Sequence, residues 1–204
     1  MILSKAVLFD LDGVLVDATE IHYEALNQAL KLFGYSISRE AHIKVFNGLP
    51  TRKKLEMMSA TEKLPVSLHD VISAQKKIYT QNLIRQRCKP SYEKIMMLEY
   101  LKKNGVKMAV CSNAVSKSVV EMLELTGIYD YFEFILGNDS YSDLKPKPDP
   151  DIYERAIDII GCVPEDVWIV EDAPHGIQAA KAAKAGRVIE VSGFKDVNLG
   201  LFSR

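Results

Sequence analysis

The sequence predicts an α/β fold in which a doubly wound parallel sheet carries helices on both faces and an all-helical segment is inserted near the N-terminus. From residue 91 onward, short apolar runs alternate with amphipathic helical patterns. Strands that are separated by helices pair in parallel within one sheet. Residues 17–89, in contrast, show helical patterns and no convincing strand. We therefore expect an α/β core made of residues 1–16 and 90–204, and a separate helical domain at residues 17–89.

The first strand is predicted at residues 6–9, an apolar run that leads into Asp10, Leu11, Asp12 and Gly13. A buried strand that ends here places both carboxylates at the carboxyl edge of the sheet, where open α/β sheets bind ligands. A turn after the strand lets Asp10 face one end of a ligand and Asp12 the other, so that one can attack while its neighbour handles a proton. The alternative is a simple Asp-Gly turn after a core strand.

The inserted segment is predicted to contain a long helix, two shorter helices and a second long helix. Gly34 ends the first, Ser38 and Thr51 cap the next two, and Ser67 with Asp70 forms a capping box for the last. His42 and His69 are expected to face solvent. The four predicted helices cover residues 21–33, 42–46, 52–59 and 70–88.

The remaining elements alternate helix and strand. Several of the helices end at a glycine, which is typical of a helix C-terminus. In order, they are helix 92–104, strand 107–111, helix 116–126, strand 134–137, helix 152–160, strand 167–170, helix 177–185 and strand 188–191.

Polar residues follow three of the predicted strands. Besides the two aspartates, Ser112-Asn113 follows the second strand and Glu171-Asp172 the fourth, while Lys147 belongs to a basic segment before a helix. Carboxylates from two strands can hold a hard cation such as Mg²⁺, and Ser112 with its neighbouring amides suits an anion. Together they describe a phosphate site with a metal and an aspartate nucleophile. The alternatives are that Ser112 caps the next helix, that Glu171-Asp172 is a solvated turn and that Lys147 is an exposed loop lysine.

Taken in order, these motifs resemble those of the haloacid dehalogenase superfamily. The resemblance is to the subgroup with a helical cap after the first strand, which holds phosphoglycolate-type phosphatases and β-phosphoglucomutases. The four motifs are matched by residues 10–14, Ser112, residues 147–153 and residues 171–176. Lys145 competes for the lysine role, but Lys147 keeps the family's Lys-Pro-x-Pro-Asp-x-Tyr register.

The resemblance implies a Mg²⁺-dependent phosphatase that hydrolyses a small phosphorylated metabolite, such as a sugar phosphate or a phosphoglycolate-like compound, through an aspartyl-phosphate. Asp10 would be the nucleophile and Asp12 the general acid and base. Ser112, Asn113 and Lys147 would bind the phosphate, and Asp10, the Asp12 carbonyl, Glu171 and Asp172 would bind Mg²⁺. In the cap, substrate specificity is expected to lie with His22, Asn47, Gly48, Arg52 and Lys53.

Other functions remain open at this stage. A β-phosphoglucomutase-like phosphosugar mutase is the nearest, because Arg52 and the pair Lys76-Lys77 could grip a second phosphate. A dehalogenase is disfavoured, since Asp12 is not needed for its metal-free chemistry. A phosphonate hydrolase is disfavoured likewise, although Lys53 and Lys54 place an amine in the cap. A phospho-accepting signalling module also uses acidic residues, a hydroxyl and a lysine at strand ends, but its acceptor lies on a middle strand and it needs no cap. A dinucleotide-binding module is unsupported because no GxGxxG follows the first strand.

The composition indicates which partners to expect. With 26 basic and 27 acidic residues the formal net charge is −1, which offers no general field for nucleic acid or an anionic membrane. The N-terminus shows no signal peptide and no apolar run reaches membrane-spanning length, so a cytoplasmic protein is expected. Three cysteines without CxxC spacing are expected to be reduced thiols. We expect a small phosphate ester as the partner, and a monomer or weak dimer.

Overall fold

The computed structural model describes residues 4–203, which divide into two compact units. One unit comprises the described residues up to Asp17 and from Cys88 onward, and the other comprises Ala18–Arg87. The chain therefore passes between the units twice, at Asp17–Ala18 and at Arg87–Cys88.

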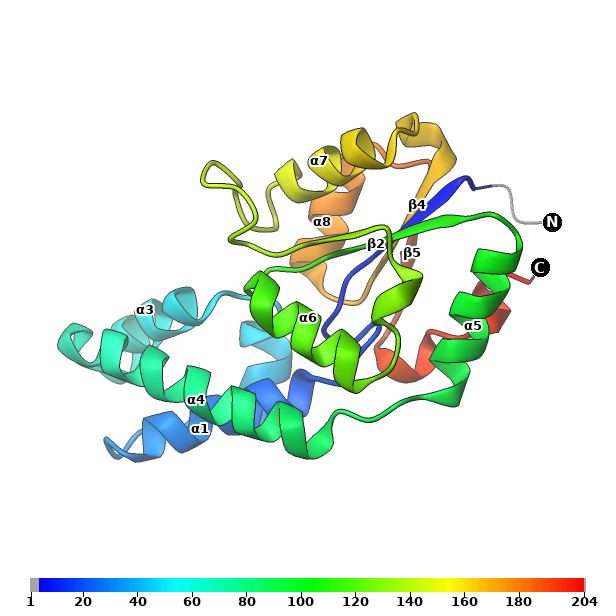
Figure 1. Ribbon diagram of the computed structural model, residues 1–204. Coiled ribbons are helices and arrows are strands. Elements are labelled where there is room, and N and C mark those ends of the chain that lie inside the picture. Colours follow the sequence, from blue (N-terminus) through cyan, green and yellow to red (C-terminus); the bar gives the residue numbers. More distant parts are fainter. Residues whose placement is uncertain (1–3, 204) are drawn as a thin grey trace. The chain divides into compact units, whose positions relative to one another are not determined.

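The first unit is built on a five-stranded parallel sheet, which confirms the predicted α/β class (Figure 1). The strand order is β3-β2-β1-β4-β5, so β1 is central. Phe9 at the end of β1 pairs with Val110 of β2 and Val170 of β4. Because the three strands end at the same level, the polar residues that follow them meet at one edge. The strands are β1 (Ala6–Phe9), β2 (Lys107–Cys111), β3 (Phe134–Leu136), β4 (Val167–Glu171) and β5 (Arg187–Glu190).

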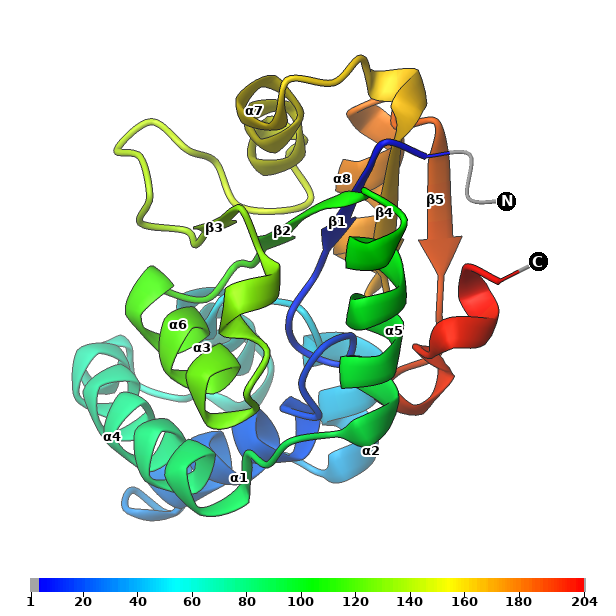
Figure 2. The same cartoon turned by 45° about the vertical axis from the view of Figure 1, so that its right-hand side comes forward.

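Helices cover both faces of this sheet, as a doubly wound fold requires (Figure 2). The pair α7 (Asp151–Ile160) and α8 (Pro174–Ala182) buries its apolar side chains against Leu8 and its neighbours on one face. The opposite face carries α5 (Tyr92–Lys103) and α6 (Ser116–Leu125). Helix α8 begins three residues earlier than predicted, because Pro174 suits the first turn of a helix.

The last described residues, up to Ser203, close the sheet face that contains Phe9. The ring of Phe202 lies 6.2 Å from that of Phe9 and 6.4 Å from that of Trp168. Lys94 of α5 is buried, and its Nζ donates hydrogen bonds to the carbonyls of Phe194 (2.6 Å) and Val197 (2.5 Å). Short 3-10 helices complete this unit: η3 (Tyr129–Tyr131), η4 (Pro164–Asp166), η5 (Phe194–Asp196) and η6 (Leu199–Leu201).

The second unit is all helical, and its two long helices lie side by side (Figure 1). Its core is formed by apolar residues such as Leu26 and Leu30 of the first helix, Leu55 of the third and Ile72 of the last. The elements are α1 (Thr19–Lys31), α2 (Arg39–Ala41), the π-helix η1 (His42–Phe46), α3 (Thr51–Glu62), the 3-10 helix η2 (Val66–Leu68) and α4 (His69–Arg87).

One of the three predicted helix caps in this unit is confirmed. Ser38 accepts a hydrogen bond from the Ala41 amide at 3.1 Å, although the helix that it caps begins at Arg39. The cap predicted at Thr51 is wrong, because Pro50 is the N-cap and Thr51 is already helical. The predicted capping box is also wrong, because Ser67 lies inside η2 and α4 begins at His69.

Both histidines that were expected in solvent are buried, so that prediction is wrong. His42 is 1% exposed and its ring lies 5.3 Å from the ring of Tyr23, whereas His69 is 3% exposed and shares a 2.7 Å hydrogen bond with the Ser59 hydroxyl. His42 lies in the short helix η1 and His69 is the first residue of α4, and in so small a unit both positions are enclosed.

The buried His42 should make the free energy of unfolding of this protein sensitive to acid. Burial, and then the nearby charges of Lys54, His22 and Lys76, lower the pKa of His42 from 6.5 to about 4. The unfolded chain therefore binds this proton at a higher pH than the folded chain, and stability is lost as the pH falls through 6.5 toward 4. Between pH 7 and pH 5 this histidine should cost about 2 kcal/mol of unfolding free energy. Urea titrations of wild type and His42→Phe at both pH values test this, and an equal acid-induced loss in the two proteins would contradict it.

Cys88, Cys111 and Cys162 are all free thiols, as predicted. Within residues 4–203, no helix is both long enough and apolar enough to cross a bilayer.

Candidate active site

Asp10 lies at the carboxyl end of the central strand, and its backbone continues the sheet. Its amide donates to the Val170 carbonyl at 3.0 Å, and the residue is only 8% exposed. Burial raises the pKa of Asp10 well above its ordinary value; the charge of Lys147 opposes this, and the negative charges of Glu171, Asp12 and Asp172 add to it. Asp10 is thus a carboxylate in a crowded, poorly solvated acidic environment.

Lys147 is the cation at the centre of this environment. Its Nζ donates to Asp10 Oδ1 at 2.6 Å, to the Cys111 carbonyl at 2.8 Å and to Glu171 Oε1 at 2.7 Å, which uses all three ammonium protons. Burial by itself lowers the pKa of Lys147, but the contacts with Asp10 and Glu171 outweigh it and raise the pKa. The alternative of an exposed loop lysine is therefore wrong for Lys147. The description of an exposed loop lysine fits Lys145 instead, whose side chain is exposed and whose Nζ lies 3.7 Å from Asp149 Oδ2.

Asn113 holds the backbone of Lys147 in place. The side chain of Asn113 accepts from the Lys147 amide at 2.9 Å through Oδ1 and donates to the Lys147 carbonyl at 3.3 Å through Nδ2. The residue after β2 is thereby fastened to the loop before α7. The sequence indicated an anion-binding amide at Asn113 but no role for its side chain.

Ser112 lies between β2 and α6 and is 1% exposed. Its Oγ accepts from the Ala114 amide at 3.0 Å, which leaves the hydroxyl proton available for a ligand. The alternative that Ser112 caps the next helix is wrong. Asp139 performs that task, since its Oδ1 accepts from the amide and the hydroxyl of Ser116 at 2.7 and 2.6 Å.

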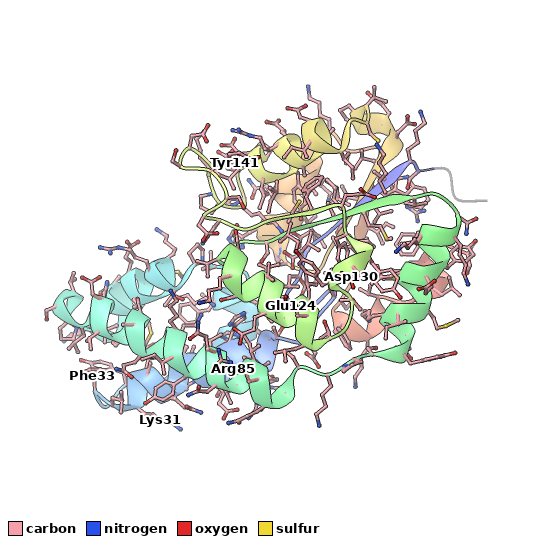
Figure 3. All side chains as sticks on the ribbon, viewed as in Figure 1. Lys31, Phe33, Arg85, Glu124, Asp130 and Tyr141 are labelled. Atoms are coloured by element: carbon pink, nitrogen blue, oxygen red, sulfur yellow. The ribbon has the colours of Figure 1, made fainter. Side chains whose placement is uncertain are left out.

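The loop between β3 and α7 is held to α7 by its own side chains. Tyr141, labelled on this loop in Figure 3, lies under the guanidinium of Arg155 at 4.6 Å from the ring centroid. Arg155 also donates to Asp143 at 3.1 Å. These contacts restrain the segment that delivers Lys147 to the site.

Asp10, Glu171 and Asp172 form an acidic cluster whose oxygens lie within 4.8 Å of one another. Burial, followed by the charges of Glu171 and Asp12, raises the pKa of Asp172 to about 7, against the opposing effect of Lys147. Asp12 is half-buried in the turn after β1, where the Gly13 amide donates to the Val16 carbonyl at 2.8 Å. Together with Asp12, the acidic cluster provides four carboxylates near the single cation Lys147, so negative charge is in excess at the site. Oxygen donors of this kind suit a hard divalent cation.

Two glycines make room for these carboxylates. Gly13 has φ +86°, and a Cβ added there would lie 2.2 Å from Asp172 Oδ2. A Cβ added at Gly176, in the first turn of α8, would lie 1.9 Å from Glu171 Oε1. The turn after β1 and the start of α8 therefore form the walls of the acidic cluster.

Gly176→Ala should displace the Glu171 carboxylate from Lys147. We expect a loss of activity of about 100-fold with the far-ultraviolet circular dichroism unchanged, which is the scale on which supporting shells of metal sites act. Gly161→Ala is the control, because no atom lies within 4 Å of an added Cβ there. That variant should lose some stability, because its φ is +70°, but no activity. Full activity of Gly176→Ala would contradict the assigned position of Glu171.

The expected specificity residues all lie in the helical unit. Asn47 and Gly48 form the loop after η1, while the side chains of Arg52 and Lys53 are 70% and 61% exposed and both reach Glu56. His22 is close enough to His42 to contribute to its lowered pKa. Sequence reasoning noted Lys54 as a cap amine but missed its burial: Lys54 is only 5% exposed and is among the groups that lower the pKa of His42. Its spacing of four residues from the buried Met58 was the available signal.

The comparison with known proteins agrees with this geometry. The family model described as haloacid dehalogenase-like hydrolase matches residues 7–189. The chain belongs to this hydrolase family. The match extends over both units and includes every residue of the acidic cluster and Lys147.

Two curated relatives and one solved structure illustrate the family. The chain is 27% identical over 190 residues to a phosphorylated carbohydrates phosphatase of Thermotoga maritima, covering 92% of this chain and 85% of the relative. It is 30% identical over 197 residues to a phosphoglycolate phosphatase of Aquifex aeolicus, covering 95% and 88%. CbbY from Rhodobacter sphaeroides, solved in complex with phosphate, has the same fold, with a TM-score of 0.81 at 24% identity, and the match covers 95% of this chain and 88% of CbbY.

Proposed function

We propose that this chain is a Mg²⁺-dependent phosphatase that hydrolyses a small phosphorylated metabolite through an aspartyl-phosphate on Asp10. The observation that carries the proposal is the buried Lys147, whose ammonium joins Asp10 to Glu171 inside an acidic cluster. A lysine in that place stabilises both the nucleophile and the charge that develops on a phosphoryl group. The names of the two curated relatives, both phosphatases, support the same reaction class.

In the first step, Asp10 attacks phosphorus. Since Oδ1 accepts from Lys147, the other oxygen, Oδ2, forms the bond to phosphorus. The bond between phosphorus and the ester oxygen breaks, and the leaving alcohol takes a proton from Asp12. Ser112, through its free hydroxyl proton, and the amide of Asn113 bind the equatorial oxygens, so that charge is stabilised as it develops.

In the second step, water hydrolyses the intermediate. Asp12, now ionised, takes a proton from the water, whose oxygen bonds to phosphorus as the bond to Asp10 breaks. Asp10, Glu171 and Asp172 with the Asp12 carbonyl would hold Mg²⁺, which when bound supplies positive charge against the phosphate oxygens. Inorganic phosphate results, Asp10 is again an ionised carboxylate and Asp12 again carries its proton, so the enzyme is ready for another cycle.

The helical unit is proposed to select the leaving group as a cap on the core. In this unit His22, Lys54 and Lys76, from three different helices, lie near enough to His42 for their charges to lower its pKa. A concentration of basic groups favours an acidic group on the leaving alcohol, such as a carboxylate or a second phosphate. Among the neighbouring lysines, the buried Lys54 is a better candidate for this role than the exposed Lys53.

Lys54→Met should therefore change substrate preference. We expect kcat/KM for a phosphate ester with an acidic leaving group to fall about tenfold, while turnover of a neutral aryl phosphate changes little. Lys53→Met is the matched control and should behave as wild type. An equal loss on all substrates would show that Lys54 serves folding or phosphate binding instead.

A screen of phosphorylated metabolites tests the proposed function. Phosphoglycolate, sugar phosphates and an aryl phosphate are incubated with the enzyme, with Mg²⁺ or with excess chelator, and the inorganic phosphate released is measured. We expect release from at least one small ester, dependent on Mg²⁺ and restored when Mg²⁺ is added back. Full activity in chelator would refute the metal requirement. Isomerisation of a sugar phosphate without release of phosphate would establish the mutase instead.

A further inference from the structure

Tyr153 of α7 contacts the site from the buried side. The residue is 0% exposed, and its hydroxyl donates to Glu171 Oε1 at 2.5 Å. This is the same oxygen that accepts from Lys147 at 2.7 Å. One oxygen of Glu171 therefore receives two strong donors, one charged and one neutral.

The other oxygen of Glu171, Oε2, receives a much weaker hydrogen bond than Oε1 does. Oε2 accepts from the Ala173 amide at 3.5 Å, which is at the outer limit of a hydrogen bond. The carboxylate is also confined by Gly176, since a Cβ added there would lie 1.9 Å from Oε1 and 2.3 Å from Oε2. The two oxygens are thus unequal, and Oε2 keeps lone pairs for a further partner.

We propose that Tyr153 is a positioning residue that orients the Glu171 carboxylate, so that Oε1 serves Lys147 and Oε2 is kept for the divalent cation. The inference rests on the proposed function, because it takes that cation to be Mg²⁺ held by Asp10, Glu171 and Asp172. Tyr153 itself contacts neither the cation nor the substrate in this assignment.

The chemistry of the two donors explains why a tyrosine is needed. An ammonium is a compact charge on a flexible stem and imposes little direction on a carboxylate. A phenol on a ring that is packed among Ile152, Ala156 and Ile169 donates along one fixed line. Partners of this kind, placed behind a metal ligand, set its orientation, and their loss commonly weakens metal binding by about 10- to 100-fold.

Tyr153→Phe isolates the hydroxyl. The ring remains, so the core packing is kept, as is the contact of Lys147 Nζ with the ring centroid at 4.7 Å. If Tyr153 served packing alone, this variant would bind Mg²⁺ as wild type does. If it orients Glu171, the dissociation constant for Mg²⁺ should rise about tenfold.

Isothermal titration calorimetry with MgCl₂ and no substrate gives this constant without reference to activity. Tyr131→Phe is the matched control, because it removes a comparable 2.7 Å bond from a tyrosine hydroxyl to Glu99 on α5. We expect Tyr131→Phe to bind Mg²⁺ as wild type does. Unchanged Mg²⁺ affinity in folded Tyr153→Phe would overturn the inference and leave the proposed function intact, whereas a wild type that binds no Mg²⁺ would overturn both.

Glu171→Asp provides a second test that leaves Tyr153 in place. The shorter carboxylate keeps its charge but cannot reach Lys147 and Tyr153 as Glu171 does. We expect it to weaken Mg²⁺ binding, and we expect Tyr153→Phe to add no further loss in that background. Independent, additive losses from the two substitutions would contradict the proposed coupling.

Discussion

Asp10→Asn is expected to abolish turnover while the protein stays folded. An amide is not a nucleophile, so the phosphoryl group has no acceptor, and we expect kcat to fall on the order of 10⁴-fold or more. The fold should tolerate the change, because burial raises the pKa of Asp10 and so favours a neutral side chain at this position. Lys147 keeps its 2.7 Å contact with Glu171 in the variant.

Steady-state kinetics with the best substrate of the screen, together with a thermal melt in the absence of metal, measures both effects. We expect a melting temperature at or above that of wild type. Ser112→Ala is the comparison: it loses one phosphate contact and should keep measurable turnover. Wild-type rates in a folded Asp10→Asn protein would exclude Asp10 as the nucleophile.

Lys147→Met should damage both activity and stability. Its removal leaves Asp10 and Glu171 buried without their cation, and breaking one partner of a buried charge pair costs about 3–5 kcal/mol. Activity should fall at least about 100-fold, because the charge opposite the phosphoryl oxygens is lost. Urea unfolding and phosphate release measure the two losses.

Lys145→Met is the control for Lys147→Met. Lys145 lies two residues away in the same segment but is exposed, and its ion pairs with Asp149 and Asp151 span 3.7 and 4.0 Å. Exposed pairs of this kind contribute about 0–1 kcal/mol, so this variant should resemble wild type. Equal effects of the two substitutions would contradict the assignment of Lys147 as the buried cation.

The sheet and the residues at its edge could be predicted from the sequence because both follow from short-range patterns. An apolar run of strand length, closed by turn residues, locates β1, β2 and β4, and parallel pairing then brings Asp10, Ser112 and Glu171 to one edge. Lys147 needed more than local pattern, because Lys145 lies in a similar setting. The family register selected Lys147, and the structure shows that Lys147 is the buried one of the two.

The residues that were missed depend on contacts between distant parts of the chain. Tyr153 was recognised as the last residue of the third motif, but its role was missed, because its bond to Glu171 spans 18 residues. The side chain of Asn113 reaches 34 residues along the chain to Lys147. In the helical unit, periodicity did not reveal that His42 and Lys54 are buried, because a polar residue near a short helix reads as exposed. Asp139 was missed for a similar reason, since the helix that it caps begins 23 residues earlier in the chain.

Trapping the phosphoryl-enzyme tests the central claim most directly. The enzyme is mixed with its substrate and Mg²⁺, quenched within milliseconds and treated with borohydride, which reduces an acyl phosphate to an alcohol and so converts the modified aspartate to homoserine. Peptide mass spectrometry then locates the change. We predict homoserine at position 10, only when substrate is present, and none in Asp10→Asn. Homoserine at another carboxylate, or sustained turnover with no modified peptide, would contradict the mechanism.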